Sequence, residues 1–108
     1  MPLGPDFSLF GTALELSSDP AALTSSEGSL LVANTAYRDR FGSEGPLKLA
    51  ADEDSGNALA MAKTMAWRDG AGCVAGIATG SGKVQVEVER AGNNGDLLLW
   101  HFPAATRL

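Results

Sequence analysis

Cys73 and His101 could together carry out nucleophilic chemistry, because a histidine can activate a thiol to which it is hydrogen-bonded. Each is the only residue of its type in the 108-residue chain. The sequence predicts strands at Cys73–Thr79, Lys83–Arg90 and Leu97–Phe102, so the two side chains fall on the first and third strands. If these strands are neighbours in sequence order, the pair is about 10 Å apart, whereas the reaction needs about 3 Å. We therefore predict no catalytic residue in this fragment, and we interpret Cys73 as a buried structural cysteine.

Other patterns resemble ligand-binding motifs but lack the residues that matter. Gly82-Lys83 ends like a phosphate-binding loop, yet Ile77 stands where the first glycine is needed. Gly70–Ala75 has the glycine spacing of a dinucleotide-binding turn, but it follows a predicted helix and leads into a strand, the reverse of the required order. One cysteine cannot form a cysteine-rich zinc site. The sequence therefore predicts no metal and no cofactor.

The composition indicates a globular protein without a nucleic-acid or membrane surface. Apolar residues make up 44% of the chain, and thirteen acidic against eight basic residues give a net charge of −5. An acidic chain without a Lys/Arg cluster does not favour binding to nucleic acid or to an anionic membrane. The longest apolar runs are far shorter than the roughly 20 residues that span a bilayer. A single cysteine suits a reducing compartment, so we expect a cytoplasmic module, whose parent protein could still be anchored in the inner membrane.

Hydrophobic spacing predicts an amphipathic helix near the start of the chain. Phe7, Phe10 and Leu14 recur at helical intervals, and Pro20 ends the segment because proline disfavours a helical residue before it. This apolar face either covers the sheet of its own domain or pairs with the same helix of a second copy, which would give a two-fold homodimer. The predicted organisation is an N-terminal helix and lead-in at 1–18, a globular domain at 19–104 and the start of a linker at 105–108.

The stretch that follows contains the most distinctive order of elements. Strands are predicted at Ala21–Thr24 and Leu30–Ala33, joined as a hairpin. Asn34 suits the N-cap of a helix over Thr35–Phe41, and a glycine follows that helix, as is common after a last turn. Asn34 could also tie this helix to the adjacent strand.

A long helix and three strands are predicted for the second half of the chain. The helix covers Ser55–Asp69, and the acidic residues just before it suit the positive end of its dipole. Ala58, Met61, Ala62, Met65 and Ala66 form its predicted apolar face. After Gly72 the period changes from helical to alternating, which gives the three strands named above. The last strand is apolar on both faces except for His101, which is typical of a central strand, and the fold class is α+β.

This order of elements resembles the PAS domain family over nearly the whole chain. Asn34-Thr35-Ala36-Tyr37 looks like the Asn-x-Ala-aromatic start of one family helix, and Ser55–Asp69 looks like the long helix before the final three-strand meander. The resemblance implies a five-stranded antiparallel sheet with helices packed on one face. The chain departs from the family at its end, where Pro103–Leu108 replaces the usual Asp-x-Thr.

PAS domains place their ligands between helices and sheet, so the resemblance implies a candidate pocket there, with ordinary core packing as the alternative. The residues predicted to line it are Tyr37, Met61, Met65, Cys73, Val86 and His101. The helix Ser55–Asp69 has no histidine for haem, and Cys73 lacks the Asn-Cys-Arg-Phe context of flavin-binding members. We therefore expect no cofactor, and any ligand would be small and apolar.

The resemblance implies a sensory and dimerisation module that transmits a signal to the output domain of a bacterial sensor histidine kinase, in two-component signal transduction. An alternative is a ligand-free protein–protein interaction module of another regulator, such as a cyclic-dinucleotide enzyme or a transcription factor. A third, different class is a small α+β enzyme. The expected partners are a second copy, paired through Phe7, Phe10 and Leu14, and a downstream signalling domain.

Overall fold

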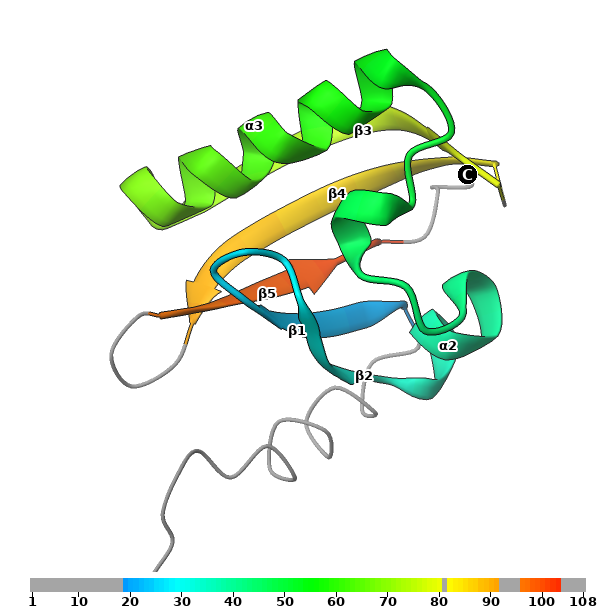
Figure 1. Cartoon of the computed structure of the whole chain (residues 1–108), viewed down its shortest axis with the longest axis horizontal. Helices are drawn as coiled ribbons and strands as arrows, with labels where there is room; N and C mark the ends of the chain where they lie inside the picture. The colour runs from blue at the N-terminus through cyan, green and yellow to red at the C-terminus, as the bar shows by residue number, and fades with distance from the viewer. Residues whose placement is uncertain (1–18, 81, 92–95, 104–108) are drawn as a thin grey trace, which may run out of the picture.

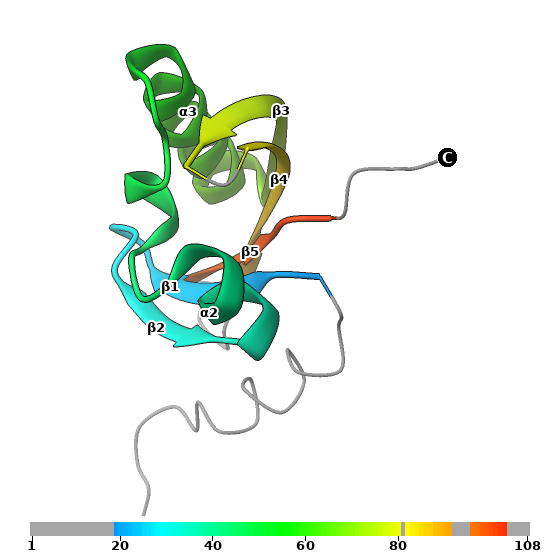
Figure 2. The same ribbon diagram turned by 90° about the vertical axis from the view of Figure 1, so that its right-hand side faces the viewer.

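The computed structural model describes residues 19–80, 82–91 and 96–103, and these form one antiparallel sheet with helices on one face (Figures 1 and 2). The five strands are β1 (Ala21–Ser25), β2 (Leu30–Ala33), β3 (Ala71–Thr79), β4 (Gly82–Ala91) and β5 (Leu97–His101), in the spatial order β2-β1-β5-β4-β3. The helices are α2 (Thr35–Phe41), the 3-10 helix η1 (Pro46–Lys48) and α3 (Glu53–Asp69). The predicted five-stranded architecture is confirmed. The predicted helix with Phe7, Phe10 and Leu14 lies outside the described residues, as does the linker at 105–108.

The hairpin and the short helix form at the residues that the sequence predicts. β2 and α2 have the predicted bounds, and β1 is one residue longer. The Asn34 side chain accepts a hydrogen bond from the Tyr37 backbone N–H, which satisfies a donor that the first turn of a helix leaves free. Gly42 ends the helix with a φ of 76°, a backbone conformation that favours glycine.

The long helix α3 begins two residues before its predicted start because Asp52 acts as its cap. The Asp52 carboxylate accepts a hydrogen bond from the Ser55 N–H at 2.8 Å, and this bond lowers the pKa of that carboxyl. Ser55, Leu59, Ala62 and Ala66 are the buried residues of the helix. The helix is therefore rotated relative to the prediction, which placed Met61 on the buried face; Met61 is in fact 62% exposed. That part of the prediction is wrong.

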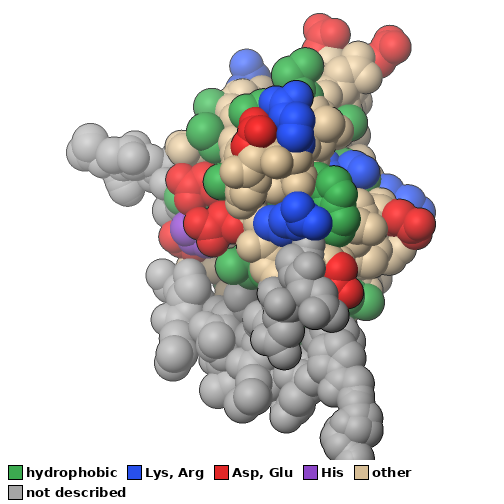
Figure 3. All heavy atoms as spheres, turned by 90° about the vertical axis from the view of Figure 1, so that its left-hand side faces the viewer, with side chains coloured by type: hydrophobic (Ala, Val, Ile, Leu, Met, Phe, Trp, Pro, Cys, Tyr) green, Lys and Arg blue, Asp and Glu red, His purple; other side chains and the backbone are tan. Residues whose placement is uncertain are grey.

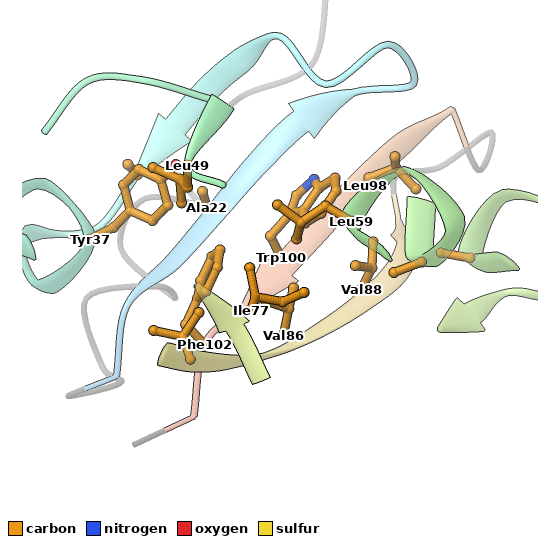
Figure 4. Close-up of a cluster of buried hydrophobic side chains, with 14 residues drawn as sticks. Ala22, Tyr37, Leu49, Leu59, Ile77, Val86, Val88, Leu98, Trp100 and Phe102 are labelled. Atoms are coloured by element: carbon orange, nitrogen blue, oxygen red, sulfur yellow. The ribbon is translucent and has the colours of Figure 1, made fainter. Parts of the chain in front are cut away.

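The core lies between the helices and the sheet, as Figure 4 shows. β4 contributes Val84, Val86 and Val88, and β5 contributes Leu98 and Trp100. As expected from its apolar sequence, β5 is the central strand. Alternate residues of a strand point to opposite faces, so Leu97, Leu99 and His101 point away from the helices, together with Ala21 and Leu23 of β1.

Candidate functional site

Two of the predicted pocket residues, Tyr37 and Val86, lie between the helices and the sheet, and both are fully buried. The Tyr37 hydroxyl donates a hydrogen bond to the Glu44 carbonyl oxygen at 2.6 Å. Its ring packs against Phe41 and Phe102, with centroid distances of 5.1 and 5.7 Å. Burial raises the pKa of Tyr37 far above its ordinary value, and the Glu44 carboxylate adds to the rise. Tyr37 is therefore a neutral hydrogen-bond donor inside the core.

The two predicted methionines lie on a flank of α3 instead. Met65 is half-buried, and its Cβ lies beside Gly72 of β3. Met61, one helical turn earlier, is exposed to solvent. The methionines lie there because the helix packs on the sheet through the buried residues Leu59, Ala62 and Ala66. This packing places the methionine side chains at the side of the helix.

Cys73 and His101 lie on the sheet face that points away from the helices. The register places Cys73 opposite Glu87, and Glu87 opposite His101. The two candidate catalytic residues are thus two strands apart, as predicted, with a carboxylate between them. Cys73 is exposed, so its interpretation as a buried cysteine is wrong. The reason is strand alternation, which turns Gly72 and Val74 towards α3 and Cys73 away from it.

The six predicted pocket residues therefore do not line one cavity, and a ligand in the interior stays a prediction. Large side chains fill the space between helices and sheet, Trp100, Phe102 and Leu59 among them. The Trp100 indole N–H donates to the Thr24 hydroxyl at 2.8 Å. Every buried side-chain nitrogen or oxygen in the described part of the chain has a hydrogen-bond partner.

A buried hydrogen-bond junction centres on Asn34, which is fully buried. Its Oδ1 accepts from the Tyr37 N–H at 2.9 Å and from the Ala21 N–H at 3.1 Å. Its Nδ2 donates to the Asp19 carbonyl oxygen at 2.9 Å. One side chain therefore joins the start of α2, the start of β1 and Asp19, which lies two residues before β1. The sequence predicts the cap and a tie to the strand, but not the bond to Asp19.

The Asp19 side chain is held from the opposite face of the sheet by His101. The His101 ring lies between two carboxylates, with Nε2 3.3 Å from Asp19 Oδ2 and Nδ1 3.3 Å from Glu87 Oε1. Figure 3 shows the histidine among acidic side chains at the surface. Both the backbone and the side chain of Asp19 are thus fixed to the sheet.

The two ends of the described domain meet at this same junction. The Phe102 N–H, just after β5, donates to the Pro20 carbonyl oxygen at 2.9 Å. β1 and β5 are neighbours with Ala21 opposite His101, so Asp19 and Pro103, the first and last described residues, both lie at the same end of this strand pair. Sequence reasoning misses this junction because the pairing of β1 with β5 joins residues far apart in the chain.

An open cleft of about 480 Å³, which the sequence patterns do not indicate, lies between the β1–β2 turn and the loop around η1. Its lining residues are Glu27, Gly28, Ser29, Leu30, Ser43, Glu44, Gly45, Leu47 and Lys48.

Within the described ranges, no cluster of three or more His, Cys, Asp or Glu residues could hold a metal ion. No described helix is long and apolar enough to cross a membrane.

Comparison with solved structures identifies the fold. A PAS domain from Colwellia psychrerythraea superposes with a TM-score of 0.69 at 12% identity, covering 93% of this chain and 97% of that one. A domain of a sensory box sensor histidine kinase/response regulator from Geobacter sulfurreducens gives 0.65 at 18% identity, covering 90% and 92%. The PAS domain of Bordetella pertussis BvgS gives 0.60 at 15% identity, covering 94% and 86%. The sequence matches no protein-family model and no curated protein. The chain has the PAS fold, as its resemblance to that family predicts.

Proposed function

We propose that this chain is a PAS sensory and dimerisation module that passes a signal to the output domain of a bacterial sensor histidine kinase. The observation that carries the proposal is the junction at which the two ends of the domain meet, around Asp19, Asn34 and Phe102. A module that relays a signal needs its flanking segments coupled to its core, and this junction supplies that coupling. One similar structure comes from a sensor histidine kinase/response regulator, which supports the choice of parent.

The route of the signal follows the hydrogen bonds of Asn34. A small apolar ligand between helices and sheet would shift α2 through Tyr37, whose N–H is bonded to Asn34 Oδ1. Asn34 in turn holds the Asp19 carbonyl oxygen, so a shift of α2 reaches the segment before position 19. Such a ligand acts only if it binds two arrangements of the domain with different affinity. The fragment itself does no catalysis, and it works in the cytoplasm.

Dimerisation is assigned to Phe7, Phe10 and Leu14. The segment that carries them leads into the described domain at Asp19, whose side chain contacts His101 on the outer face of the sheet. A pair of such helices would therefore lie next to the junction, and a change in the junction would change the geometry of the helix pair. Sedimentation of the full chain tests this role: Phe10→Asp should lower the mass from two chains to one, and an unchanged mass would count against it.

A ligand-free interaction module of another regulator is the second candidate, because large side chains fill the interior and its buried polar groups are paired. In that case a partner protein, and not a small molecule, would shift the junction. Native mass spectrometry of the purified chain separates the two candidates. A retained small molecule supports the sensory function, and its absence at every tested condition supports the interaction module.

The relay itself is tested in a chimera in which this chain replaces the PAS domain of a sensor histidine kinase. Asn34→Asp keeps the acceptor for Tyr37 but removes the Nδ2 donor to Asp19. We expect it to change the rate of autophosphorylation several-fold, whereas the control Asp39→Asn, on the exposed side of α2, should leave the rate unchanged. Equal rates for the unaltered chimera and Asn34→Asp would refute the route through Asn34.

A further inference from the structure

The outer strand β3 has one side on which its backbone groups point away from the sheet. The Arg90 N–H donates to the Gly70 carbonyl oxygen at 2.9 Å, so this carbonyl group points towards β4, while the Gly70 N–H is used by the end of α3, where it donates to the Ala66 carbonyl oxygen. In an antiparallel ladder the residues whose backbone groups point towards the neighbouring strand alternate, and Gly72 and Val74 therefore also face β4. The N–H and C=O groups of Ala71, Cys73 and Ala75 point outward, where the order of the sheet places no further strand of the described chain.

Some outward backbone groups elsewhere along the sheet edges are paired. Beyond the irregularity between Val74 and Ile77, the outward groups of Ala78 are paired, its N–H with the Ser55 hydroxyl at 2.9 Å and its carbonyl oxygen with the Ala51 N–H at 2.7 Å. On the opposite edge strand, the Arg38 guanidinium donates to the Ala33 carbonyl oxygen. Natural sheets protect their edges with charges, prolines or covering segments. Residues 71–75 contain no charged residue and no proline, and no strand of the described chain pairs with their outer side, so within the described residues this edge is open.

An apolar flank lies beside this open edge. α3 packs tightly over β3, since a Cβ on Gly72 would lie 2.7 Å from the Ala62 carbonyl oxygen and 3.0 Å from the Met65 Cβ. Figure 1 shows α3 running along β3. Met61 lies one turn from Met65 on the same side of the helix, and it is one of two exposed large hydrophobic residues in the described chain. Methionine side chains adapt well to a partner surface.

We propose that the β3 edge, residues 71–75, pairs antiparallel with the same edge of a second copy, with the two-fold axis at Cys73. This register places Cys73 opposite Cys73 of the second copy and Ala71 opposite its Ala75. Every outward N–H and C=O group of the segment then gains a partner, because all three residues belong to hydrogen-bonded pairs. The segment pairs with itself without a mismatch.

Three features favour a second copy over a foreign strand. The segment contains no charged side chain, so the two-fold axis brings no like charges together within it. Its outward side chains are Ala, Cys and Ala, small enough for identical strands to approach at the normal spacing. The same axis brings the Met61 and Met65 flank of one α3 towards that of the other. The irregularity at Gly76, whose φ is 73°, ends the pairing and fixes its register.

Amide hydrogen exchange of the full chain, followed by NMR at increasing protein concentration, tests the pairing atom by atom. At a concentration where nine-tenths of the chains are paired, the amides of Ala71, Cys73 and Ala75 should exchange about tenfold more slowly than in dilute protein. The amide of Leu31, on the opposite edge strand, should not change. Fast exchange of the three amides at all concentrations overturns the proposal. Slow exchange that does not depend on concentration also overturns it, since another part of the same chain would then cover the edge.

Disulfide trapping through Cys73, the only cysteine, tests the position of the axis. The Cα atoms of a hydrogen-bonded pair lie about 5.5 Å apart, within the range that a disulfide spans, so mild oxidation should yield a covalent dimer. Met61→Lys should lower the yield at least about fivefold because like charges would then meet across the axis, and its control Ala60→Lys should not. Equal yields for these two variants overturn the proposal. A yield lost in Phe10→Asp also overturns it, because the contact would then depend on the N-terminal helix.

Discussion

Replacing Asn34 with alanine should destabilise the domain more than the loss of an ordinary helix cap. The change removes the acceptor for the Tyr37 N–H, the acceptor for the Ala21 N–H and the donor to the Asp19 carbonyl oxygen. Loss of an N-cap costs about 1 kcal/mol, and each buried backbone group left without a partner costs about 1–3 kcal/mol. Ala21 is buried, so its N–H falls in that class. We expect a total near 3 kcal/mol, a large share of the roughly 5–15 kcal/mol that stabilise a domain.

Urea unfolding followed by circular dichroism measures this loss, and Asn34→Asp is the comparison variant. The aspartate keeps both acceptor oxygens, but it loses the donor to Asp19 and places a negative charge in a fully buried site. It should therefore cost about 3–5 kcal/mol at neutral pH, and part of this cost should be recovered at a pH low enough to protonate the carboxylate. The denaturant dependence should be the same for all three proteins, because the buried surface is the same. A cost below about 1 kcal/mol for Asn34→Ala would refute the reasoning, since it would equal that of an isolated cap.

Two further predictions concern the packing and the capping of α3. Gly72→Ala should lower the free energy of unfolding, measured by thermal unfolding, by about 1–3 kcal/mol, because its Cβ would meet the Ala62 carbonyl oxygen. The control Gly80→Ala should not lower it by this amount, because a Cβ there meets nothing within 4 Å. Equal losses for the two variants would contradict the close packing at Gly72. The hydrogen bond from Ser55 lowers the pKa of Asp52, so its stabilising effect is present above the ordinary carboxyl pKa and is lost as pH falls through the lowered one. Asp52→Asn should remove this part of the pH dependence of the unfolding free energy. An unaltered pH dependence in the variant would contradict the assignment of this effect to Asp52.

The elements of the fold could be predicted because their signals are local. A cap such as Asn34 and a glycine after the last turn fix a helix within a few residues, and strict alternation fixes β4. α3 begins earlier than predicted because Asp52, and not a residue closer to the apolar face, caps it. The central place of β5 could also be predicted, since a strand that is apolar on both faces is covered on both sides.

The composition of the predicted pocket could not be derived in the same way. Helical spacing groups Met61 with Ala62 and Met65, but it does not say which side of the group faces the sheet. Gly72 decides this, because its missing side chain lets the alanine stripe of α3 approach β3 and leaves the methionines at the flank. Likewise, alternation assigns Cys73 and Val74 to opposite faces, but only the position of α3 tells which face is the core.

The two proposed contacts between copies lie on different parts of the molecule and constrain one another. The segment with the predicted N-terminal helix leads into the described domain at Asp19, close to β1 and β5, whereas the open edge lies on β3, with β4 between β3 and β5. Each contact is two-fold, and each uses the same surface on both copies. Two different two-fold contacts on one chain do not close a dimer, because each copy of such a dimer keeps a free surface of the other kind; the assembly then continues to a closed tetramer or to a longer array. A closed signalling dimer therefore requires one contact to be much weaker than the other. The small area of residues 71–75 makes the β3 edge the weaker contact, so it should form only at a higher protein concentration than the pairing of the N-terminal segments, and independently of that pairing.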